Sequence, residues 1–235
     1  MLENYKKENV LFLDIETVPQ YSSYLEMPET FQKLWDHKAL RIRQNETEVS
    51  EDLYQRAGIY AEFGQIICIS VGFFHDQKFR MKSFAGHDEK LLLEDFALTV
   101  GGRFFSKNWS LCAHNGKEFD FPYIARRMLI NGIKLPVLLD QSGKKPWEVP
   151  HLDTMDLWRF GDYKNYTSLE LLAAIFQIPT PKDDIRGSDV ARVYWEEKDL
   201  PRIVRYCEKD VATIARIFLR YKGEPLFSDE DIEIG

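Results

Sequence analysis

The chain has 235 residues and a mass of 27.7 kDa, a length that suits one compact domain with a sizeable buried core. Hydrophobic residues make up 44% and charged residues 29%, a composition that excludes a disordered or fibrous protein. The net charge of −7 argues against a polyanionic partner, but residues 121–222 form a mildly basic block with 17 basic and 14 acidic side chains.

Apolar patterning predicts strands that alternate with helices. Strands are expected where short apolar runs lie between polar residues, at 10–15, 66–74, 78–84, 109–114 and 152–158. Helices are expected where apolar residues recur every three or four positions, at 88–105, 118–130, 168–176 and 199–221. The pattern predicts an α/β protein, with a mixed sheet and flanking helices in a single domain.

Two segments depart from this alternation. Residues 19–64 contain a predicted helix near 30–43 followed by a polar stretch, so we interpret them as a helical insertion over the sheet edge. Residues 223–235 carry five acids and no base, and we expect them to form a frayed, solvated acidic C-terminal tail. The folded domain is therefore predicted to span residues 1–222.

Acidic side chains stand where several predicted elements begin or end. Asp14 and Glu16 are two residues apart at the end of the first strand, so both point to the same side of the sheet. Asp120 falls in the first turn of a helix, directly after a strand. Asp210 lies on the last helix, one turn after Tyr206. Like charges held close raise one another's pKa unless a cation neutralises them, so the first pair suits a metal site.

Each acid alone also admits a structural explanation, such as a helix-dipole partner or a backbone hydrogen bond. The order of the acids along the chain, with the residues around them, is a more specific signal. The segments LDIET at 13–17, HNGKEFD at 114–120 and YCEKD at 206–210 resemble, in sequence and spacing, the three motifs of the DEDD 3′–5′ exonucleases. Those motifs are D-x-E, N-x3-F/Y-D and Y-x3-D, and the resemblance runs from about residue 10 to residue 220.

The chain is most similar to stand-alone bacterial proteins related to the exonuclease domain of family B DNA polymerases. That resemblance implies the fold of the DnaQ-like, ribonuclease H-like superfamily. Other members of the superfamily carry a histidine five residues before the last aspartate, where this chain has Arg205 followed by Tyr206. The chain therefore resembles the tyrosine (DEDDy) subclass.

The resemblance implies an enzyme that hydrolyses phosphodiester bonds from the 3′ end of DNA, preferably single-stranded, by a two-metal mechanism. Oxygen ligands suit Mg²⁺ or Mn²⁺, and the implied metal ligands are Asp14, Glu16, Asp120 and Asp210. Tyr206 is implied to orient the attacking water, because a phenol with an ordinary pKa near 10 is a poor base at neutral pH. The implied nucleic-acid contacts are Thr17, Asn115 and Phe119.

Other functions stay open at this point. One is an RNA-trimming 3′–5′ exoribonuclease, and another is a catalytically silent nucleic-acid-binding module on the same fold. The complete set of four acids and a tyrosine argues against a silent module. A polymerase or repair partner in trans is also compatible with the resemblance. Asp153 and Asp156 match none of the motif spacings, so we predict a structural role for both.

Two further residue classes add weaker indications. The cysteines Cys68, Cys112 and Cys207 are far apart and have apolar neighbours, which favours a reducing, cytoplasmic location over a disulfide framework. No apolar run is long enough to span a bilayer. Three basic pairs are candidates for following a phosphate backbone, although such pairs are more often solvated: Arg126 with Arg127, Lys144 with Lys145, and Lys182 with Arg186.

Overall fold

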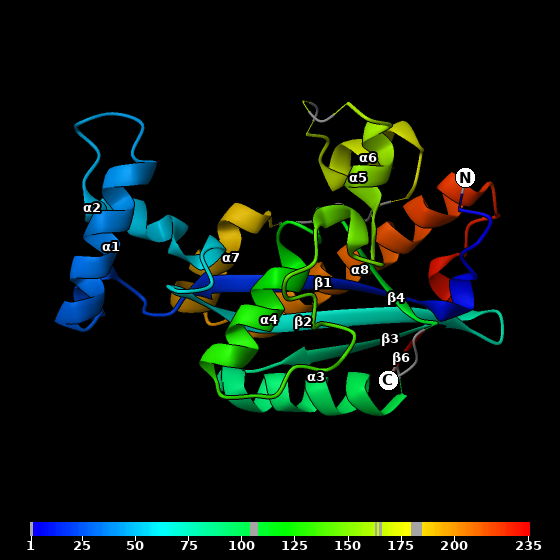
Figure 1. Ribbon diagram of the computed structural model, residues 1–235, viewed down its shortest axis with the longest axis horizontal. Helices are drawn as coiled ribbons and strands as arrows, with labels where there is room; N and C mark the ends of the chain where they lie inside the picture. Colours follow the sequence, from blue (N-terminus) through cyan, green and yellow to red (C-terminus); the bar gives the residue numbers. More distant parts are fainter. Residues whose placement is uncertain (1, 104–107, 163, 165, 180–184) are drawn as a thin grey trace.

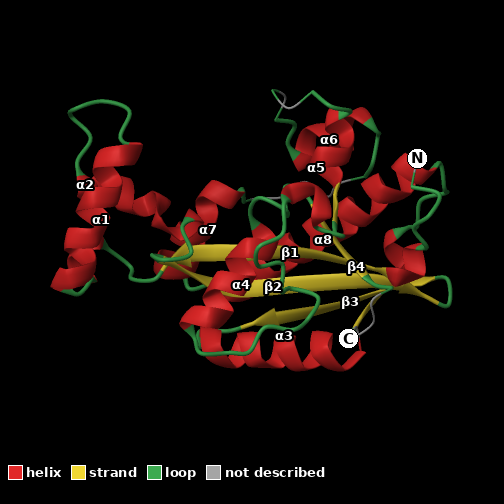
Figure 2. Ribbon diagram, in the orientation of Figure 1, coloured by secondary structure: helices red, strands yellow, loops and turns green. Residues whose placement is uncertain are grey.

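A mixed β-sheet forms the centre of the protein (Figures 1 and 2). The structure is a computed structural model, and it describes residues 2–103, 108–162, 164, 166–179 and 185–235. Across the described residues the sheet order is β5-β4-β1-β2-β3-β6. The strands are β1 (Val10–Pro19), β2 (Gly64–His75), β3 (Lys78–Ala85), β4 (Ser110–Ala113), β5 (Leu152–Asp153) and β6 (Ile232–Ile234). β1, β2 and β3 pair antiparallel as a meander, whereas β4, β5 and β6 join by parallel pairing.

Helices cover both faces of this sheet. The described helices are α1 (Glu29–Ile42), α2 (Ser50–Leu53), α3 (Glu89–Arg103), α4 (Asp120–Ile130), α5 (Thr154–Arg159), α6 (Leu169–Ile175), α7 (Val190–Arg192) and α8 (Leu200–Lys222). Of these, α3 and α4 pack on one face of the sheet and α8 on the other. The helix predicted at 88–105 corresponds to α3, and its expected end at Phe105 lies outside the described residues. The fold class predicted from the sequence, a mixed sheet with flanking helices, is confirmed.

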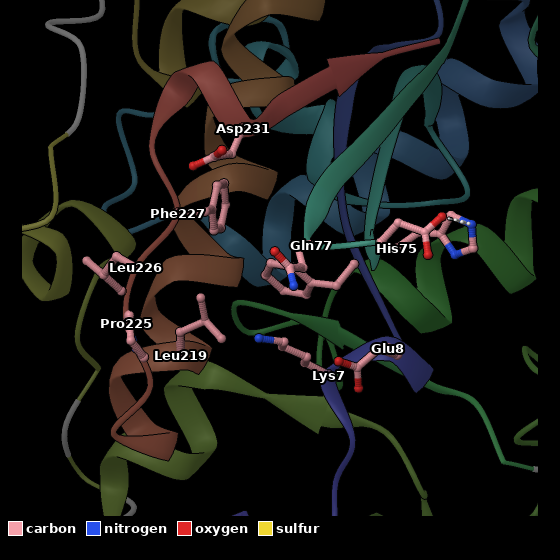
Figure 3. A pocket seen from close by; sticks show the side chains of 11 residues that line it. Lys7, Glu8, His75, Gln77, Leu219, Pro225, Leu226, Phe227 and Asp231 are labelled. Atoms are coloured by element: carbon pink, nitrogen blue, oxygen red, sulfur yellow. Dashed lines mark ion pairs between the residues drawn. The ribbon is translucent and has the colours of Figure 1, made fainter.

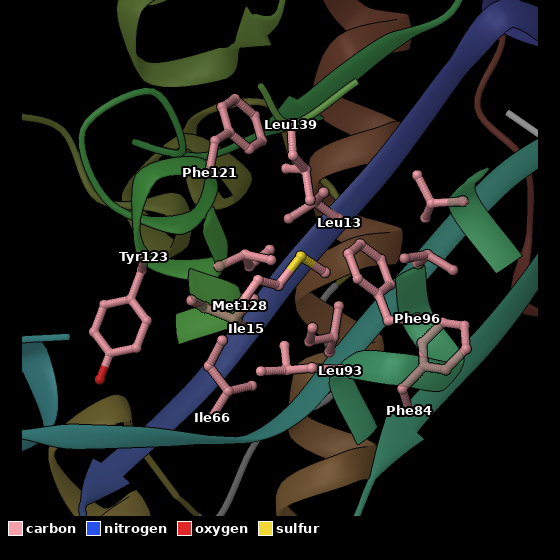
Figure 4. Packing of buried hydrophobic residues seen from close by; sticks show 14 of the residues in the cluster. Leu13, Ile15, Ile66, Phe84, Leu93, Phe96, Phe121, Tyr123, Met128 and Leu139 are labelled. Atoms are coloured by element: carbon pink, nitrogen blue, oxygen red, sulfur yellow. The ribbon is translucent and has the colours of Figure 1, made fainter. Parts of the chain in front are cut away.

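The alternation of side chains along β1 divides the core into two layers. Leu13 and Ile15 pack with residues of α3 and α4, including Phe96 and Met128, in the cluster drawn in Figure 4. Phe12, with the opposite orientation, packs beneath α8 in a second cluster. Because side chains alternate along a strand, the acids at the even positions 14 and 16 continue the row that faces α8.

The strand predicted at 152–158 is wrong beyond its second residue. β5 ends at Asp153, and α5 begins at Thr154. The reason is a helix cap: the Asp153 carboxylate accepts hydrogen bonds from the main-chain N–H groups of Met155 at 3.0 Å and Asp156 at 3.3 Å. An apolar run of this length does not by itself distinguish a strand from a capped helix.

The C-terminal segment is ordered, so the prediction of a frayed tail is wrong. Its strand β6 pairs with β3, with Ile232 opposite Phe79. The acids of this segment have cationic partners in the body of the protein: Asp229 accepts from Arg216 at 2.5 Å, and Asp231 pairs with Lys78 at 3.1 Å. These ion pairs and the strand pairing connect residues far apart in the sequence, which the charge count of the tail does not reveal.

The insertion between β1 and β2 forms a helical arm, defined here as residues 20–63, that stands beyond the ends of these strands (Figure 1). It was predicted to lie over the sheet edge, but β1 and β2 are neighbours in the sheet interior, so their connection extends from the strand ends. The arm has its own small core around Trp35, which is fully buried. At Gly64, where the chain leaves the arm and enters β2, there is no room for a side chain, because a Cβ would lie 2.3 Å from the Tyr123 hydroxyl oxygen.

His151 makes the protein sensitive to acid. The ring is 2% exposed, its Nδ1 accepts from the Leu111 N–H at 3.2 Å, and its Nε2 donates to the Leu138 carbonyl at 2.8 Å. Burial lowers the pKa of His151 from 6.5 to about 4. Below about pH 6.5 the His151 ring therefore becomes protonated in the unfolded chain but stays neutral in the folded protein. As a result, the free energy of unfolding falls between about pH 6.5 and pH 4 by up to about 3 kcal/mol.

The measurement is urea unfolding of the wild type and His151→Gln at about pH 7.5 and about pH 5. We expect the substitution to cost stability at the higher pH, and the difference between the two proteins to shrink at the lower pH. Other titrating groups contribute equally to both proteins and cancel in this comparison. A difference that does not change with pH contradicts the assignment.

Candidate active site

β1 presents the first two acids of the site. Asp14 lies opposite Ser70 of β2, and Glu16 lies opposite Cys68, so all four side chains point to the face covered by α8. The regular register breaks directly after Glu16, at a β-bulge between Glu16 and Thr17. A bulge increases the local twist of a strand. Glu16 is thus the last residue of β1 before this change in register with β2.

The third acid comes from the turn between β4 and α4. Asp120 is the first residue of α4 and is 3% exposed. Its carboxylate accepts hydrogen bonds from its own main-chain N–H and from that of Ile15 on β1. This bond to β1 holds Asp120 against the strand that carries the first two acids.

The turn before Asp120 is fixed from outside by the two aspartates predicted to be structural. Asp153 accepts from the main-chain N–H of Asn115 at 2.9 Å and of Lys117 at 3.1 Å. Asp156 forms an ion pair with the Lys117 ammonium group at 2.9 Å. Asn115 has a φ of 62°, a left-handed conformation that asparagine tolerates better than most residues. Asp153 and Asp156 therefore determine the path of the turn that presents Asp120.

α8 supplies the last acid and the tyrosine. The helix begins after Asp199, whose carboxylate accepts from the Arg202 N–H at 3.1 Å, and it packs on the even-numbered face of β1. Tyr206 and Asp210 are one turn apart, and the Tyr206 hydroxyl donates a hydrogen bond to the Asp210 carboxylate. The contact of α8 with β1 thus brings Asp210 to the acids of that strand.

Asp120 and Asp210 lie close enough to the two acids of β1 to raise their pKa values. Removal from water raises the pKa of Asp14, and the charges of Asp210, Glu16 and then Asp120 raise it further. Burial raises the pKa of Glu16 in the same way, again with contributions from Asp210 and Asp120. The pKa of Asp120 rises to about 8, mainly through burial. Each of these shifts favours the protonated carboxyl group, because the folded chain alone does not balance the concentrated negative charge.

This donor set fits divalent cations. Carboxylate oxygens are the ligands that Mg²⁺ and Mn²⁺ prefer, and a dication removes the repulsion that raises these pKa values. One ligand atom each from Asp14, Glu16 and Cys207 lies within 4.8 Å of the others, which is close enough to surround an ion. Asp14 and Glu16 belong to the ligand set expected from the sequence motifs, and Cys207 is an addition to it.

The three residues predicted to contact nucleic acid have different surroundings. The Thr17 hydroxyl bonds to the Tyr123 hydroxyl, which itself donates to the Gly58 carbonyl at 2.7 Å. The Phe119 ring lies 5.3 Å from the ring of Tyr123 and is partly exposed. The side-chain oxygen of Asn115 is buried and has no hydrogen-bond partner among the described residues. Of the three, Asn115 has the most evident unused capacity for a ligand.

The two cysteines beside the acids were not among the predicted site residues. Cys207 donates a hydrogen bond to the Asp14 main-chain carbonyl at 3.4 Å, and Cys68 bonds to Cys207. The position of Cys207 within the Y-x3-D motif could have indicated that it lies near the site. Cys68 has no such signal, because its position opposite Glu16 depends on the β1–β2 register.

In the pair of Arg126 and Arg127, Arg126 is exposed but Arg127 is unable to contact a phosphate backbone. Arg127 is 3% exposed and forms a buried ion pair with Glu89. Its guanidinium group also donates to the Ala61 carbonyl at 2.8 Å, so it connects α4 to the base of the arm. Lys182 lies outside the described residues.

A pocket of about 590 Å³ lies away from the acids, at the opposite end of β1 (Figure 3). The β2–β3 turn around Gln77 and the C-terminal segment around Phe227 line it, and so does Lys7. None of the four acids contributes to its wall. The candidate active site is therefore the carboxylate cluster and not this pocket.

The fold and the site together define a ribonuclease H-like protein with four clustered carboxylates. A family B DNA polymerase from the hyperthermophilic archaeon Pyrobaculum calidifontis has a similar structure, with a TM-score of 0.57 and 16% sequence identity. The similarity covers 90% of this chain and 24% of the polymerase chain, so this chain spans about a quarter of that protein. At this identity the comparison establishes the fold.

A family model described as "predicted 3′-5′ exonuclease related to the exonuclease domain of PolB" matches residues 59–226, which is more than half of the chain. The chain belongs to this family. The matched range contains Asp120, Tyr206 and Asp210 but begins after Asp14 and Glu16. In the part of the chain that the structure describes, no helix combines the length and apolar character needed to cross a membrane.

Proposed function

We propose that this protein is a divalent-metal-dependent exonuclease that removes nucleotides from the 3′ end of DNA, preferably single-stranded. The observation that carries the proposal is the convergence of four carboxylates from β1, α4 and α8 beside the Tyr206 hydroxyl. The family to which the chain belongs supports the reaction class.

Two divalent ions, Mg²⁺ or Mn²⁺, bound by Asp14, Glu16, Asp120 and Asp210 would place positive charge against the phosphodiester oxygens and increase the acidity of an attacking water. The chain contributes fixed positions for the ligands. Asp14 and Glu16 project from one strand of the sheet interior, and Asp120 is bonded to that strand. Ligands held in this way need little reorganisation when substrate arrives, which favours the transition state.

Tyr206 suits a positioning role better than that of a base. Burial and the neighbouring carboxylates, first Asp210 and then Glu16, raise the pKa of its phenol, so the hydroxyl keeps its proton at neutral pH. The hydroxyl donates to Asp210 and its oxygen can accept a hydrogen bond from water. Tyr206 would therefore orient the nucleophile relative to the Asp210 carboxylate.

Thr17, Asn115 and Phe119 would hold the terminal nucleotides. Phe119 has a partly exposed ring at the start of α4, and stacking on such a ring tolerates every base. Asn115 offers its buried, unpartnered amide oxygen to a donor on the sugar or base. This combination supports a nuclease that recognises a strand end without sequence preference.

The test is digestion of end-labelled single-stranded DNA, duplex DNA and RNA with Mg²⁺, with Mn²⁺ and with EDTA. We expect loss of nucleotides from the 3′ end of single-stranded DNA, and no digestion in EDTA. Asp14→Asn should be inactive, whereas Asp95→Asn, which removes an exposed carboxylate on α3, should be fully active. Faster digestion of RNA would support the exoribonuclease instead, and binding without hydrolysis would support the silent module.

Substitution of Asn115 by glycine tests the nucleotide contact. Glycine adopts the left-handed conformation of this residue without strain and leaves the main-chain bond to Asp153 in place, so the melting temperature should not fall. Loss of one hydrogen bond to substrate should raise KM for single-stranded DNA by about tenfold. Steady-state kinetics and thermal melting measure the two effects, and an unchanged KM would remove Asn115 from the nucleotide contacts.

A further inference from the structure

Cys207 places a sulfur atom directly beside the carboxylates. It is fully buried on the side of α8 that faces β1, and its ligand atom lies within 4.8 Å of those of Asp14 and Glu16. Its thiol donates to the main-chain carbonyl of Asp14 at 3.4 Å, which fixes the side chain against the strand. The candidate metal site therefore has a mixed set of oxygen and sulfur donors.

A second thiol lies behind the first. Cys68 stands opposite Glu16 in the β1–β2 register and hydrogen-bonds to Cys207. The sulfur of Cys68 also lies 3.6 Å from the Ser70 hydroxyl. Both cysteines are completely buried and are free thiols. The inner wall of the carboxylate site thus consists of two sulfur atoms contributed by different elements, β2 and α8.

Sulfur and oxygen donors select different ions. Mg²⁺ and Mn²⁺ bind carboxylate oxygens and gain little from a thiol, whereas Zn²⁺, Cd²⁺ and Co²⁺ accept sulfur readily. Donor atoms on one tetrahedral ion, each about 2.0–2.3 Å from it, lie roughly 3.5 Å apart. Atoms already within 4.8 Å of one another therefore need to move by little more than about 1 Å to meet such an ion.

We propose that Cys207 makes the site a trap for thiophilic divalent ions of the Zn²⁺ and Cd²⁺ class, bound through Asp14, Glu16 and Cys207 in competition with Mg²⁺ or Mn²⁺. The inference rests on the metal site of the proposed function and adds a specificity-determining residue to it. On binding, a sulfur–metal bond forms and the thiol proton passes to solvent, with no change of oxidation state. The bound thiophilic ion would exclude the ions that the reaction requires.

The experiment titrates Co²⁺ and Cd²⁺ into the wild-type protein in the absence of nucleic acid and records the near-ultraviolet spectrum. We expect a sulfur-to-metal charge-transfer band in the wild type and its loss in Cys207→Ser. Cys112→Ser is the matched control, because Cys112 is equally buried but packs in the apolar core on β4, and it should retain the band. The affinity for Cd²⁺ should fall by about tenfold or more in Cys207→Ser, while the affinity for Mn²⁺ should change by less than about twofold.

¹¹³Cd NMR of the wild-type protein gives a second test that does not depend on the folding of a variant. A resonance in the range of mixed sulfur and oxygen ligation supports the proposal, and a resonance typical of oxygen ligands alone overturns it. A charge-transfer band that persists in Cys207→Ser overturns it as well. Both measurements are made without substrate, so a protein that binds Cd²⁺ through sulfur but digests no DNA would contradict the proposed function and leave this inference standing. An active exonuclease without the charge-transfer band would support the proposed function and overturn this inference.

Discussion

Millimolar Mn²⁺ is expected to raise the melting temperature of this protein by several degrees. In the folded chain alone, burial and mutual repulsion raise the pKa values of Asp14, Glu16 and Asp120, and a dication relieves that repulsion. An ion present at about 100 times its dissociation constant adds about 2.7 kcal/mol to the free energy of unfolding. For a chain of this length about 1 kcal/mol shifts the melting temperature by about 2–4 °C, so the rise is about 5–10 °C.

Asp14→Asn separates this effect from nonspecific ion binding. Without metal, the substitution removes one of the repelling charges, so we expect the variant to melt at or above the wild-type temperature. With Mn²⁺, it should lose most of the rise, because Asp14 is placed among the metal ligands. Asp95→Asn should keep the full rise. Thermal melts of the three proteins with and without Mn²⁺ measure these effects. A wild-type melting temperature that Mn²⁺ does not change would count heavily against a metal site.

Tyr206→Phe is expected to slow hydrolysis by roughly 10- to 1,000-fold, because it removes the hydroxyl that bonds to Asp210 and that we propose orients the nucleophile. Substrate binding should be nearly unaffected, because the phenyl ring and its packing remain. Asp210→Ala should cost far more activity, because it removes a carboxylate of the proposed metal site. The ranking of the two variants follows from the difference between a positioning residue and a ligand.

Single-turnover rates on a labelled oligonucleotide compare these variants directly. Substrate affinity, measured separately by fluorescence anisotropy with Ca²⁺ in place of the active ion, shows whether binding is intact. A fully active Tyr206→Phe would remove the reason for placing this chain in the tyrosine subclass. Equal losses in both variants would indicate that Tyr206 acts by holding Asp210 in place.

The four acids were accessible from the sequence because their relations are local. Two residues along a strand return a side chain to the same face, which links Asp14 to Glu16. Four residues along a helix bring side chains onto one face, which links Tyr206 to Asp210. Asp120 stands at the junction of a strand and a helix, and both elements have clear periodicity. In the structure, Asp120 and Asp210 lie close enough to Asp14 and Glu16 to raise the pKa of both.

The patterns of apolar and acidic residues misled in two places. The segment after Leu152 has the apolar character of a strand, but Asp153 caps a helix there and also holds the turn at Asn115. The acidic tail has the composition of a solvated terminus, but β3 offers an open edge and Arg216 offers a charge. The first outcome depends on a local helix cap, which the apolar run does not reveal. The second depends on the pairing of β6 with β3, which lies far away in the sequence.

The amino-acid sequence by itself determined the acids, the tyrosine and the alternation of strands and helices, because backbone geometry fixes spacing over a few residues. Only the tertiary structure decided which side chains stand opposite them. Cys68 faces Glu16 because of the register between β1 and β2, and a shift of one residue would turn Cys68 to the other face of the sheet. Cys207 reaches Asp14 because the apolar stripe of α8 packs on one face of β1. The sulfur wall of the site therefore depends on strand register and helix packing, which are set by the whole core and not by any segment of the chain.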